Sequence, residues 1–350
     1  EQDEVKEKYG NNLKTSLDFN LQQKAYELLG DKKGAIVALN PKTGEVLALV
    51  SKPSYNPNNL KEIWEDVNKN ENRPLLNRAT SGLYPPGSIF KVVTSASALQ
   101  NIDGLMSKIF VDNGSLVFNE TQSLKNYGGA ALGSINFRTA VIRSSNVVFG
   151  QLGLDLGNKS LKKTAEDFYF NKDIPSPDIA IENSRFPVLK SYEKGNIAQS
   201  AIGQASLLAT PMEMALVSST IANDGIMMKP YIVKEVVNNK GITIDKKDPE
   251  SLGEIISKDV ATIIKDLMEA VVSEGTGGNA AVEGIRVCGK TGTADHKEGG
   301  YGYLPHSWFM GFAPYEDPQI AIAVIVEEGG QGGGIASQIA SQIIRTALYK

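Results

Sequence analysis

GIRVCGKTGTA, residues 284–294, begins a series of three apolar runs near the end of the chain. The next two are HSWFMGFAP (306–314) and QIAIAVIVEE (319–328), and turn-forming segments separate the three, a Gly-containing one at 295–305 and a Pro-containing one at 315–318. Their β-branched and aromatic content predicts three sequential strands, joined as an antiparallel meander. Two more runs near the start, GAIVAL (34–39) and GEVLALVS (44–51), flank a Pro-containing turn and predict a hairpin.

Helical patterns flank these strands and fill the middle of the chain. Apolar residues recur at helical spacing after Asp18, and residues 88–100 are apolar nearly all round, which predicts a buried helix. Thr210 and Pro211 open a further helix that ends near Gly225. Other helices are predicted over 259–272 and 335–348. The fold class is therefore α/β (α+β): one antiparallel sheet built from both chain ends, with helices on its faces, plus an all-helical subdomain formed by the middle of the chain.

Composition describes an ordinary globular protein. The 350 residues are 41% hydrophobic and 22% charged, and the net charge of −4 does not favour nucleic acid as a partner. A single cysteine excludes an internal disulfide. Residues 1–16 are polar and are interpreted as a linker or the remnant of a preceding domain, while residues 17–350 are interpreted as one functional domain.

PPGSIFK (85–91) is the first candidate catalytic motif. It places Ser88 and Lys91 three residues apart, so on a helix both lie on one face. Pro and Gly end the preceding loop, so Ser88 is expected at the helix N-terminus, where free N–H groups favour an oxyanion. Lys91 stands among apolar neighbours, which depresses the pKa of an amine and makes it a candidate base for the serine.

Two further motifs carry polar groups of the same kind. IRSSNVV (142–148) offers the Ser144 hydroxyl as a proton relay and the Asn146 amide as a hydrogen-bonding group for a substrate carbonyl. The strand motif in 288–294 offers Lys290 for an anionic group and two threonine hydroxyls for a carboxylate. Gly292 is expected to let a substrate backbone lie close to this strand. The strand residues predicted to line the site are Lys290, Thr291, Gly292 and Thr293.

The three motifs together resemble a known family. Ser-x-x-Lys, Ser-x-Asn and Lys-Thr-Gly occur in this order, as in penicillin-binding proteins and class A β-lactamases. The segments 35–58, 84–99, 201–225 and 306–314 also resemble segments of one group, the transpeptidase domains of class B, monofunctional penicillin-binding proteins. A second Lys-Thr-Gly, at 42–44, matches a structural hairpin of that family.

This resemblance implies a function. Ser88 is the expected acylated nucleophile, Lys91 its base, and Ser144 and Asn146 the second pair, with an oxyanion hole from the N–H groups of Ser88 and Thr293. The expected reaction is D,D-transpeptidation: a D-Ala-D-Ala stem peptide of peptidoglycan acylates the serine, D-Ala leaves, and an amine of a second stem peptide resolves the ester. β-Lactams are expected to acylate the same serine. No cofactor is expected to take part in catalysis.

The resemblance also implies a place and partners. The family acts on the extracytoplasmic face of the bacterial membrane, so a single N-terminal anchor is expected outside the sequence given. The implied partners are stem peptides, β-lactam antibiotics, a membrane-embedded glycosyltransferase and other cell-wall synthesis proteins.

Three other functions share these motifs. A class A β-lactamase needs a deacylating glutamate, for which Glu166 is a candidate, although the long spacing between the second and third motifs disfavours it. A D,D-carboxypeptidase uses water as the acceptor. A non-enzymatic β-lactam-sensing domain also keeps the serine.

The last feature is a cluster of metal-binding residue types. The only cysteine and both histidines lie between positions 288 and 306. A structural zinc site is therefore a hypothesis, with the ligands Cys288, Asp295, His296 and His306, in which zinc would join two neighbouring strands. The alternative interpretation is a buried thiol and ordinary histidines.

Overall fold

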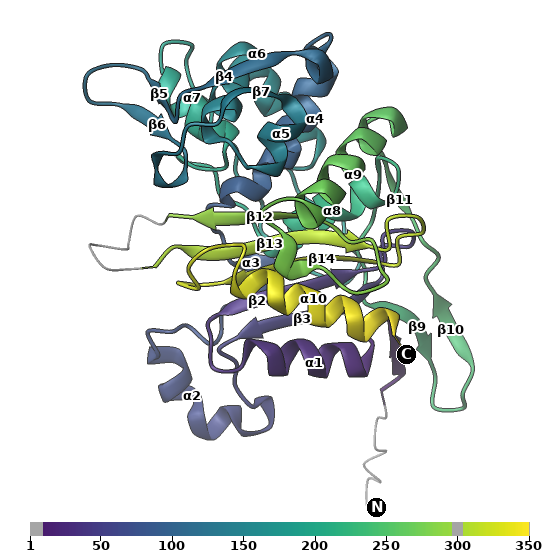
Figure 1. Ribbon diagram of the computed structural model, residues 1–350. Helices are drawn as coiled ribbons and strands as arrows, with labels where there is room; N and C mark the ends of the chain where they lie inside the picture. The colour runs from purple at the N-terminus through teal and green to yellow at the C-terminus, as the bar shows by residue number, and fades with distance from the viewer. Residues whose placement is uncertain (1–9, 296–303, 350) are drawn as a thin grey trace, which may run out of the picture.

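The central sheet has five antiparallel strands contributed by both ends of the chain. The computed structural model describes residues 10–295 and 304–349 (Figure 1). The strand order is β12 (Cys288–Ala294), β13 (His306–Ala313), β14 (Ile320–Val326), β2 (Gly34–Leu39) and β3 (Val46–Lys52). The predicted meander and hairpin are confirmed, and β14 joins them by pairing with β2.

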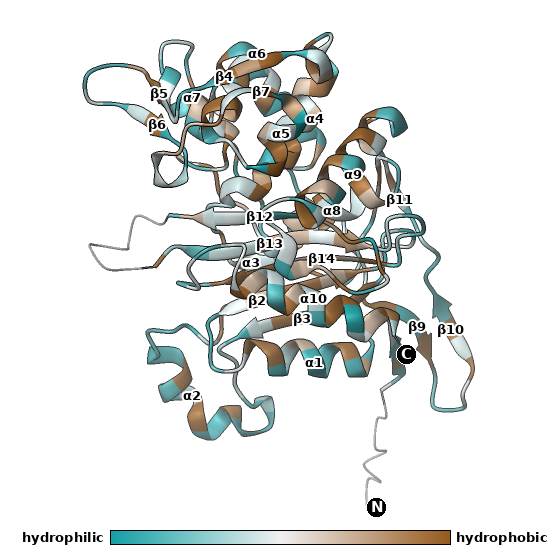
Figure 2. Ribbon diagram, in the orientation of Figure 1, coloured by the Kyte–Doolittle hydropathy of each residue, from teal (hydrophilic) through white to brown (hydrophobic). Residues whose placement is uncertain are grey.

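Helices cover both faces of this sheet. α1 (Phe19–Leu29) and α10 (Ile335–Leu348) pack on one face, and α8 (Pro211–Ala222) and α9 (Lys258–Ser273) pack on the other. Strands covered on both faces are apolar at successive positions, since neither face meets water. β13 and β14 are accordingly buried at every residue, and Figure 2 shows β14 mostly in brown between the helices.

The predicted helix boundaries follow from their caps. The Asp18 carboxylate accepts a hydrogen bond from the Leu21 N–H at 3.1 Å, and the Thr210 hydroxyl accepts one from the Glu213 N–H at 3.1 Å. Pro211 occupies the first position of α8, where the missing N–H has no intrahelical partner to lose. Every residue of α8 is buried, so this helix lies within the core.

A helical subdomain stands beside the edge of the sheet that β12 forms (Figure 1). Its helices are α4 (Lys91–Asn101), α5 (Phe137–Ile142), α6 (Asn146–Asp167) and α7 (Lys194–Ala201). The prediction of an all-helical subdomain is wrong, because two small ladders complete it: β4 (Ile109–Asp112) with β7 (Gly133–Asn136) and β5 (Ser115–Val117) with β6 (Ser123–Lys125). The three candidate motifs lie where this subdomain meets β12.

The remaining elements lie at the margins. β1 (Asn12–Thr15) pairs with β9 (Val233–Val237), which also pairs with β10 (Thr243–Lys246), and β8 (Ile226–Met228) pairs with β11 (Ser251–Glu254). The polar segment predicted as a linker thus contributes one strand. The connection 51–87 contains α2 (Leu60–Lys69) and α3 (Arg78–Ser81). The short 3₁₀ turns are η1 (Pro57–Asn59), η2 (Gly87–Phe90), η3 (Leu105–Ser107), η4 (Tyr127–Gly129) and η5 (Gly278–Ala280). No helix within 10–295 and 304–349 has the length and apolarity to cross a membrane.

Candidate active site

Ser88 lies on the 3₁₀ turn η2, which leads directly into α4. The sequence predicts an α-helical first turn here, and the structure has the tighter 3₁₀ form instead. Gly87 makes this turn possible: its φ is +57°, and a Cβ there would lie 2.6 Å from the Thr293 carbonyl oxygen. The Trp308 indole donates to the Pro85 carbonyl at 3.0 Å. The half-buried serine is therefore pressed against β12 by the packing of its own turn.

The segment just before this turn is also held in place by hydrogen bonds to distant parts of the chain. Tyr84 exchanges backbone hydrogen bonds with Ala209, and its hydroxyl donates to the Glu327 carboxylate at 2.8 Å. Glu327 in turn forms a 2.6 Å ion pair with the buried Arg78. Burial and the Glu327 charge raise the pKa of Tyr84. None of these three side chains was singled out from the sequence, because their partners come from segments far apart in the chain.

Lys91 is one turn after Ser88 and is almost completely buried, with 1% of its surface exposed. Its ammonium nitrogen lies 2.8 Å from the Ser144 carbonyl oxygen, 2.7 Å from Asn146 Oδ1 and 3.2 Å from Ser144 Oγ. Burial, followed by repulsion from Lys290, lowers the pKa of Lys91 well below its usual value. The structure therefore joins the first two motifs and gives the pKa shift the direction expected from the sequence.

The second motif is a tight junction between α5 and α6. Ser144 N–H donates to Val141 O and Ser145 N–H donates to Ala140 O, which is the hydrogen-bond pattern of a helix end with one left-handed residue. That residue is Ser144, with φ +55°. Glycine normally takes this place, so a serine here is under local strain. The turn itself fixes the direction of the Ser144 hydroxyl. Ser145 then caps α6 by accepting from the Val148 N–H at 3.0 Å.

Lys290, in the middle of β12, completes the convergence. It is fully buried, and its nitrogen lies 2.9 Å from Ser144 Oγ and 3.0 Å from the Thr291 carbonyl oxygen. Burial lowers the pKa of Lys290 to about 7. Two buried amines therefore contact one hydroxyl oxygen, an arrangement that can move a proton between them.

The other predicted strand residues have protein partners. The Thr291 and Thr276 hydroxyls lie 2.8 Å apart, and Thr293 Oγ1 accepts from the Gly332 N–H at 3.1 Å. A Cβ on Gly292 would lie 2.9 Å from Ile89 Cγ2 and 3.0 Å from the Pro86 carbonyl oxygen. In this structure, then, Gly292 makes room for the turn that carries the nucleophile.

The proposed zinc ligands do not come together. In the β12–β13 register Cys288 pairs with Phe312, whereas His306 pairs with Ala294. Six residues of strand separate these positions, about 20 Å, because the hairpin folds His306 back to the far end of β12. The four-ligand set is therefore wrong. His296 lies outside the described residues, and among those described no group of three or more His, Cys, Asp or Glu side chains could hold a metal ion.

The two separated residues have other roles. Cys288 is completely buried in the main hydrophobic cluster, and burial raises the pKa of its thiol. The His306 ring meets Tyr84 edge to face at 5.6 Å, and its Nδ1 accepts from the Glu328 N–H at 3.1 Å. Both side chains thus serve the packing around β13.

Glu166 lies away from the three candidate motifs. It lies near the C-terminal end of α6, whereas Asn146 begins that helix, and it forms a 2.5 Å ion pair with Lys162 one turn away. Its hydrogen bond with Lys162 lowers the pKa of this carboxyl. A deacylating role of the β-lactamase kind has no support from this position.

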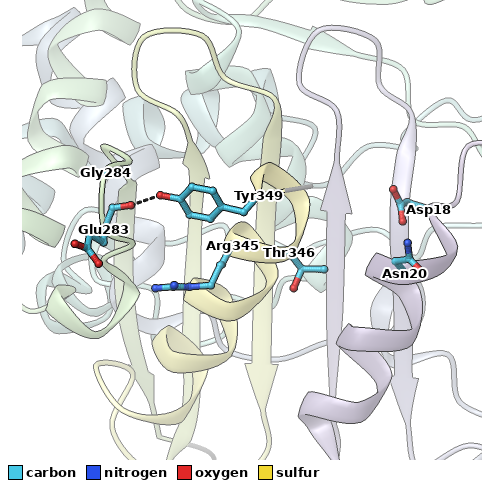
Figure 3. Close-up of a pocket in the computed structure, with 7 residues that line it drawn as sticks. All are labelled: Asp18, Asn20, Glu283, Gly284, Arg345, Thr346 and Tyr349. Atoms are coloured by element: carbon cyan, nitrogen blue, oxygen red, sulfur yellow. Dashed lines mark hydrogen bonds between the residues drawn. The ribbon is translucent and has the colours of Figure 1, made fainter.

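A cavity of about 1020 Å³ lies away from these motifs. Figure 3 shows it between the start of α1 and the end of α10, with the Tyr349 hydroxyl donating to the Glu283 carbonyl. Its lining residues are Asp18, Asn20, Glu283, Gly284, Arg345, Thr346 and Tyr349. None of the three motifs contributes to it.

Several known proteins are similar to this chain both in sequence and in fold. Residues 34–345 match the model of the penicillin binding protein transpeptidase domain. The chain is 36% identical to the peptidoglycan D,D-transpeptidase PbpA of Mycolicibacterium smegmatis, over 97% of this chain and 73% of that protein. It superposes with a TM-score of 0.90 on a ceftriaxone acyl-enzyme complex of penicillin-binding protein A from M. tuberculosis, at 33% identity, covering 97% of this chain and 81% of that one. A D,D-transpeptidase domain from Eggerthella lenta gives 0.89 at 36% identity, with coverages of 97% and 83%.

Proposed function

Because the chain belongs to the family of penicillin-binding protein transpeptidase domains, we propose that it cross-links peptidoglycan through an acyl-enzyme on Ser88. One observation carries the assignment of roles: the buried amines of Lys91 and Lys290 converge on the Ser144 hydroxyl, and Lys91 follows Ser88 by one turn of the chain. A serine without a histidine partner needs such a base. Among the described residues Lys91, whose pKa is lowered by burial, meets this need.

Acylation follows from this arrangement. A neutral Lys91 amine donates to the Ser144 carbonyl and to Asn146 Oδ1 and keeps its lone pair for a proton. Ser88 Oγ bonds to the carbonyl carbon of the penultimate D-Ala, and its proton passes to Lys91. The amide C–N bond then breaks. The leaving D-Ala amine takes this proton from Lys91 through the Ser144 hydroxyl, and the Lys290 nitrogen, 2.9 Å from that hydroxyl oxygen, keeps it in place for the transfer.

Deacylation reverses the path. An amine of a second stem peptide attacks the ester carbon and gives up a proton through the Ser144 hydroxyl to Lys91. The bond to Ser88 Oγ breaks, and Lys91 passes this proton to the serine. A β-lactam opens by the same attack, but its amine stays tethered to the acyl group and obstructs the acceptor. The N–H groups of Ser88 and Thr293 are the proposed oxyanion hole, supported by the close approach of Gly87 to the Thr293 carbonyl.

The substrates and setting follow from the family. The named relative from Mycolicibacterium smegmatis is a peptidoglycan D,D-transpeptidase. We place this domain on the extracytoplasmic face, held by an N-terminal anchor and working with a membrane-embedded glycosyltransferase and other cell-wall proteins. Its ligands are stem peptides and β-lactams. The acyl transfer needs no cofactor, since lysine amines and backbone N–H groups supply every step.

Replacement of the nucleophile tests this function. Ser88→Ala is expected to abolish covalent labelling by a fluorescent penicillin without changing the melting temperature, because only one half-buried hydroxyl is removed. Ser273→Ala, on the exposed face of α9, is the control and should label normally. An acyl adduct on the Ser88 variant, detected by intact mass, would overturn the assignment.

We propose that Cys288 serves as a core residue and not as a zinc ligand. Cys288→Ala is expected to lower the free energy of unfolding by about 1 kcal/mol, the usual effect of a small core truncation. Elemental analysis should give the same zinc content for the variant and the parent protein. Stoichiometric zinc in the parent that is lost in the variant would contradict this proposal.

A further inference from the structure

Asp112, the last residue of β4, is a fully buried carboxylate outside the three motifs. It has no lysine or arginine within ion-pair distance in the described part of the chain. Its oxygens accept hydrogen bonds from the Gly114 N–H at 2.8 Å, the Ser145 hydroxyl at 2.6 Å, and Asn126 Nδ2 at 2.8 and 2.9 Å. Burying an unpaired carboxylate is costly even with such partners. The groups that donate to Asp112 show which part of the structure this carboxylate stabilises.

Two of its three donors hold the second motif. Ser145 is the residue between Ser144 and Asn146, and it caps α6. Asn126 donates with its nitrogen to Asp112 and to Ala130 O, which turns its oxygen toward the start of α6. That oxygen accepts from the Asn146 N–H at 2.8 Å and the Val147 N–H at 3.1 Å. Asp112 thus fixes the first turn of α6 directly and through the orientation of one amide.

The turn at Ser144, which these hydrogen bonds stabilise, is strained and carries the hydroxyl that contacts both lysines. Ser144 is in the left-handed region with φ +55°, which costs roughly 1–2 kcal/mol for a residue with a side chain. Its hydroxyl oxygen has to stay within reach of both amines, at 3.2 Å from Lys91 and 2.9 Å from Lys290. A small rotation of this turn would break one of these contacts, and the proton path depends on both.

We propose that Asp112 is a positioning residue for acyl transfer, which holds the Ser144–Asn146 turn through Ser145 and Asn126 so that the Ser144 hydroxyl lies between the two lysines. This inference rests on the proposed function of that site. Asp112 touches neither substrate nor Ser88, so its effect is transmitted through the turn and through its charge.

The charge gives a readout that a purely structural residue lacks. In the described chain, the charged groups acting on the Lys91 ammonium are Lys290 on β12, which lowers the pKa of Lys91, and Asp112 on β4, which raises it. Removing the Asp112 charge therefore lowers the pKa of Lys91 further. The neutral base would then form at lower pH, so the acylation rate would rise with pH at a more acidic midpoint.

The experiment compares acylation rates across pH for the parent domain and two variants, using a fluorescent penicillin. Asp112→Asn is expected to slow acylation about 10- to 100-fold, because a displaced proton-transfer group loses part of its usual contribution of about 10²–10⁴-fold, and to move the midpoint to lower pH. Ser145→Ala, which keeps the charge, is expected to slow acylation about 10-fold with the midpoint unchanged. Asp155→Asn, which removes a surface carboxylate paired with Lys108, is the control and should change neither.

The outcomes separate the two proposals. Normal rates in both variants, or a drop in Asp112→Asn that is uniform across pH and parallels a lower melting temperature, would overturn the positioning role. If Asp112→Asn does not fold, a Ser145→Ala variant with an unchanged rate overturns it alone. Labelling of Ser88→Ala would instead overturn the proposed function itself.

Discussion

Two buried lysines meeting at one serine hydroxyl are the chemical centre of this domain. Lys91 and Lys290 are 1% and 0% exposed, and each would be charged in water. Burial and mutual repulsion oppose two charges so close together. The arrangement therefore favours one neutral amine, which is the form that the proposed mechanism requires to accept the proton of Ser88. The base is created by the folded surroundings of an ordinary lysine.

Lys91→Ala is expected to slow acylation at least ~10²-fold, because a positioned base contributes about that much. In the parent the rate should rise with pH as Lys91 loses its proton, at a midpoint well below the ordinary lysine range, since the pKa of Lys91 is lowered. In the variant this rise should disappear. Stopped-flow acylation measured at several pH values checks both points.

The control for this prediction is Lys108→Ala, a surface lysine of the same subdomain. Its rate and pH profile should match the parent. Near-normal acylation in Lys91→Ala would mean that another group takes the proton.

At the scale of elements, the site is made by two turns and one strand edge. The 3₁₀ turn η2 brings Ser88 against β12, and the left-handed junction at Ser144 brings α6 to the same place. Each turn includes a residue with positive φ. The first is fixed by a backbone hydrogen bond from Gly87 to Gly203, and the second by side-chain hydrogen bonds to Asp112, Asn126 and Lys290. The geometry of the cleft therefore depends on junctions between elements more than on the interior of any helix.

Gly87→Ala tests the first of these junctions. The new Cβ would lie 2.6 Å from the Thr293 carbonyl oxygen, on a residue with φ +57°. We expect the free energy of unfolding to fall by roughly 1–2 kcal/mol because of the backbone conformation alone. The displaced Ser88 should also lower the acylation rate by about tenfold or more. Thermal melting and penicillin acylation measure the two effects separately.

Gly104→Ala is the matched control for this substitution. Gly104 has φ +67°, but no atom lies within 4 Å of its Cβ position. The same backbone cost is expected there with no change in acylation. Equal acylation by the Gly87 and parent proteins would show that the close approach to β12 is not needed.

At the scale of the whole molecule, α8 runs through the core between the sheet and the helices, and it carries one ionisable side chain. Glu213 is completely buried, and neither carboxylate oxygen has a hydrogen-bond partner among the described residues. Burial raises the pKa of Glu213 well above its usual value. The folded protein therefore keeps this carboxyl protonated under conditions in which the unfolded chain ionises it.

The sign of the resulting pH dependence is fixed. Below the unfolded pKa of about 4.3, both states are protonated and the group costs nothing extra. As the pH rises above it, the unfolded state loses its proton, so the free energy of unfolding falls by roughly 1.4 kcal/mol per pH unit until the folded state ionises. Glu213→Gln should remove this part of the decline. Denaturant unfolding at pH 5 and pH 8 measures the difference between variant and parent.

Glu254→Gln, an exposed position on β11, provides the control for this comparison. It should leave the pH dependence of the parent unchanged. A Glu213→Gln variant with the same decline as the parent would contradict the prediction.

Several features were predictable because they are local in the sequence. The meander, the hairpin, the caps at Asp18 and Thr210, and the family implied by the three motifs are confirmed. The zinc set was wrong because closeness in sequence was taken for closeness in space. A hairpin brings His306 to Ala294 and leaves Cys288 at the other end of the strand.

By itself the sequence determined the elements and the chemical inventory: apolar periodicity specifies strands and helices, and the motifs specify a serine, two lysines and an amide. The tertiary structure alone decided how these groups meet. The depressed pKa of Lys290 requires burial by distant segments, and the hold of Asp112 on the Ser144 turn requires β4, Asn126 and α6 to pack together. The physical reason is that hydrogen-bond geometry and desolvation depend on neighbours in space, which are set only when the whole chain has folded.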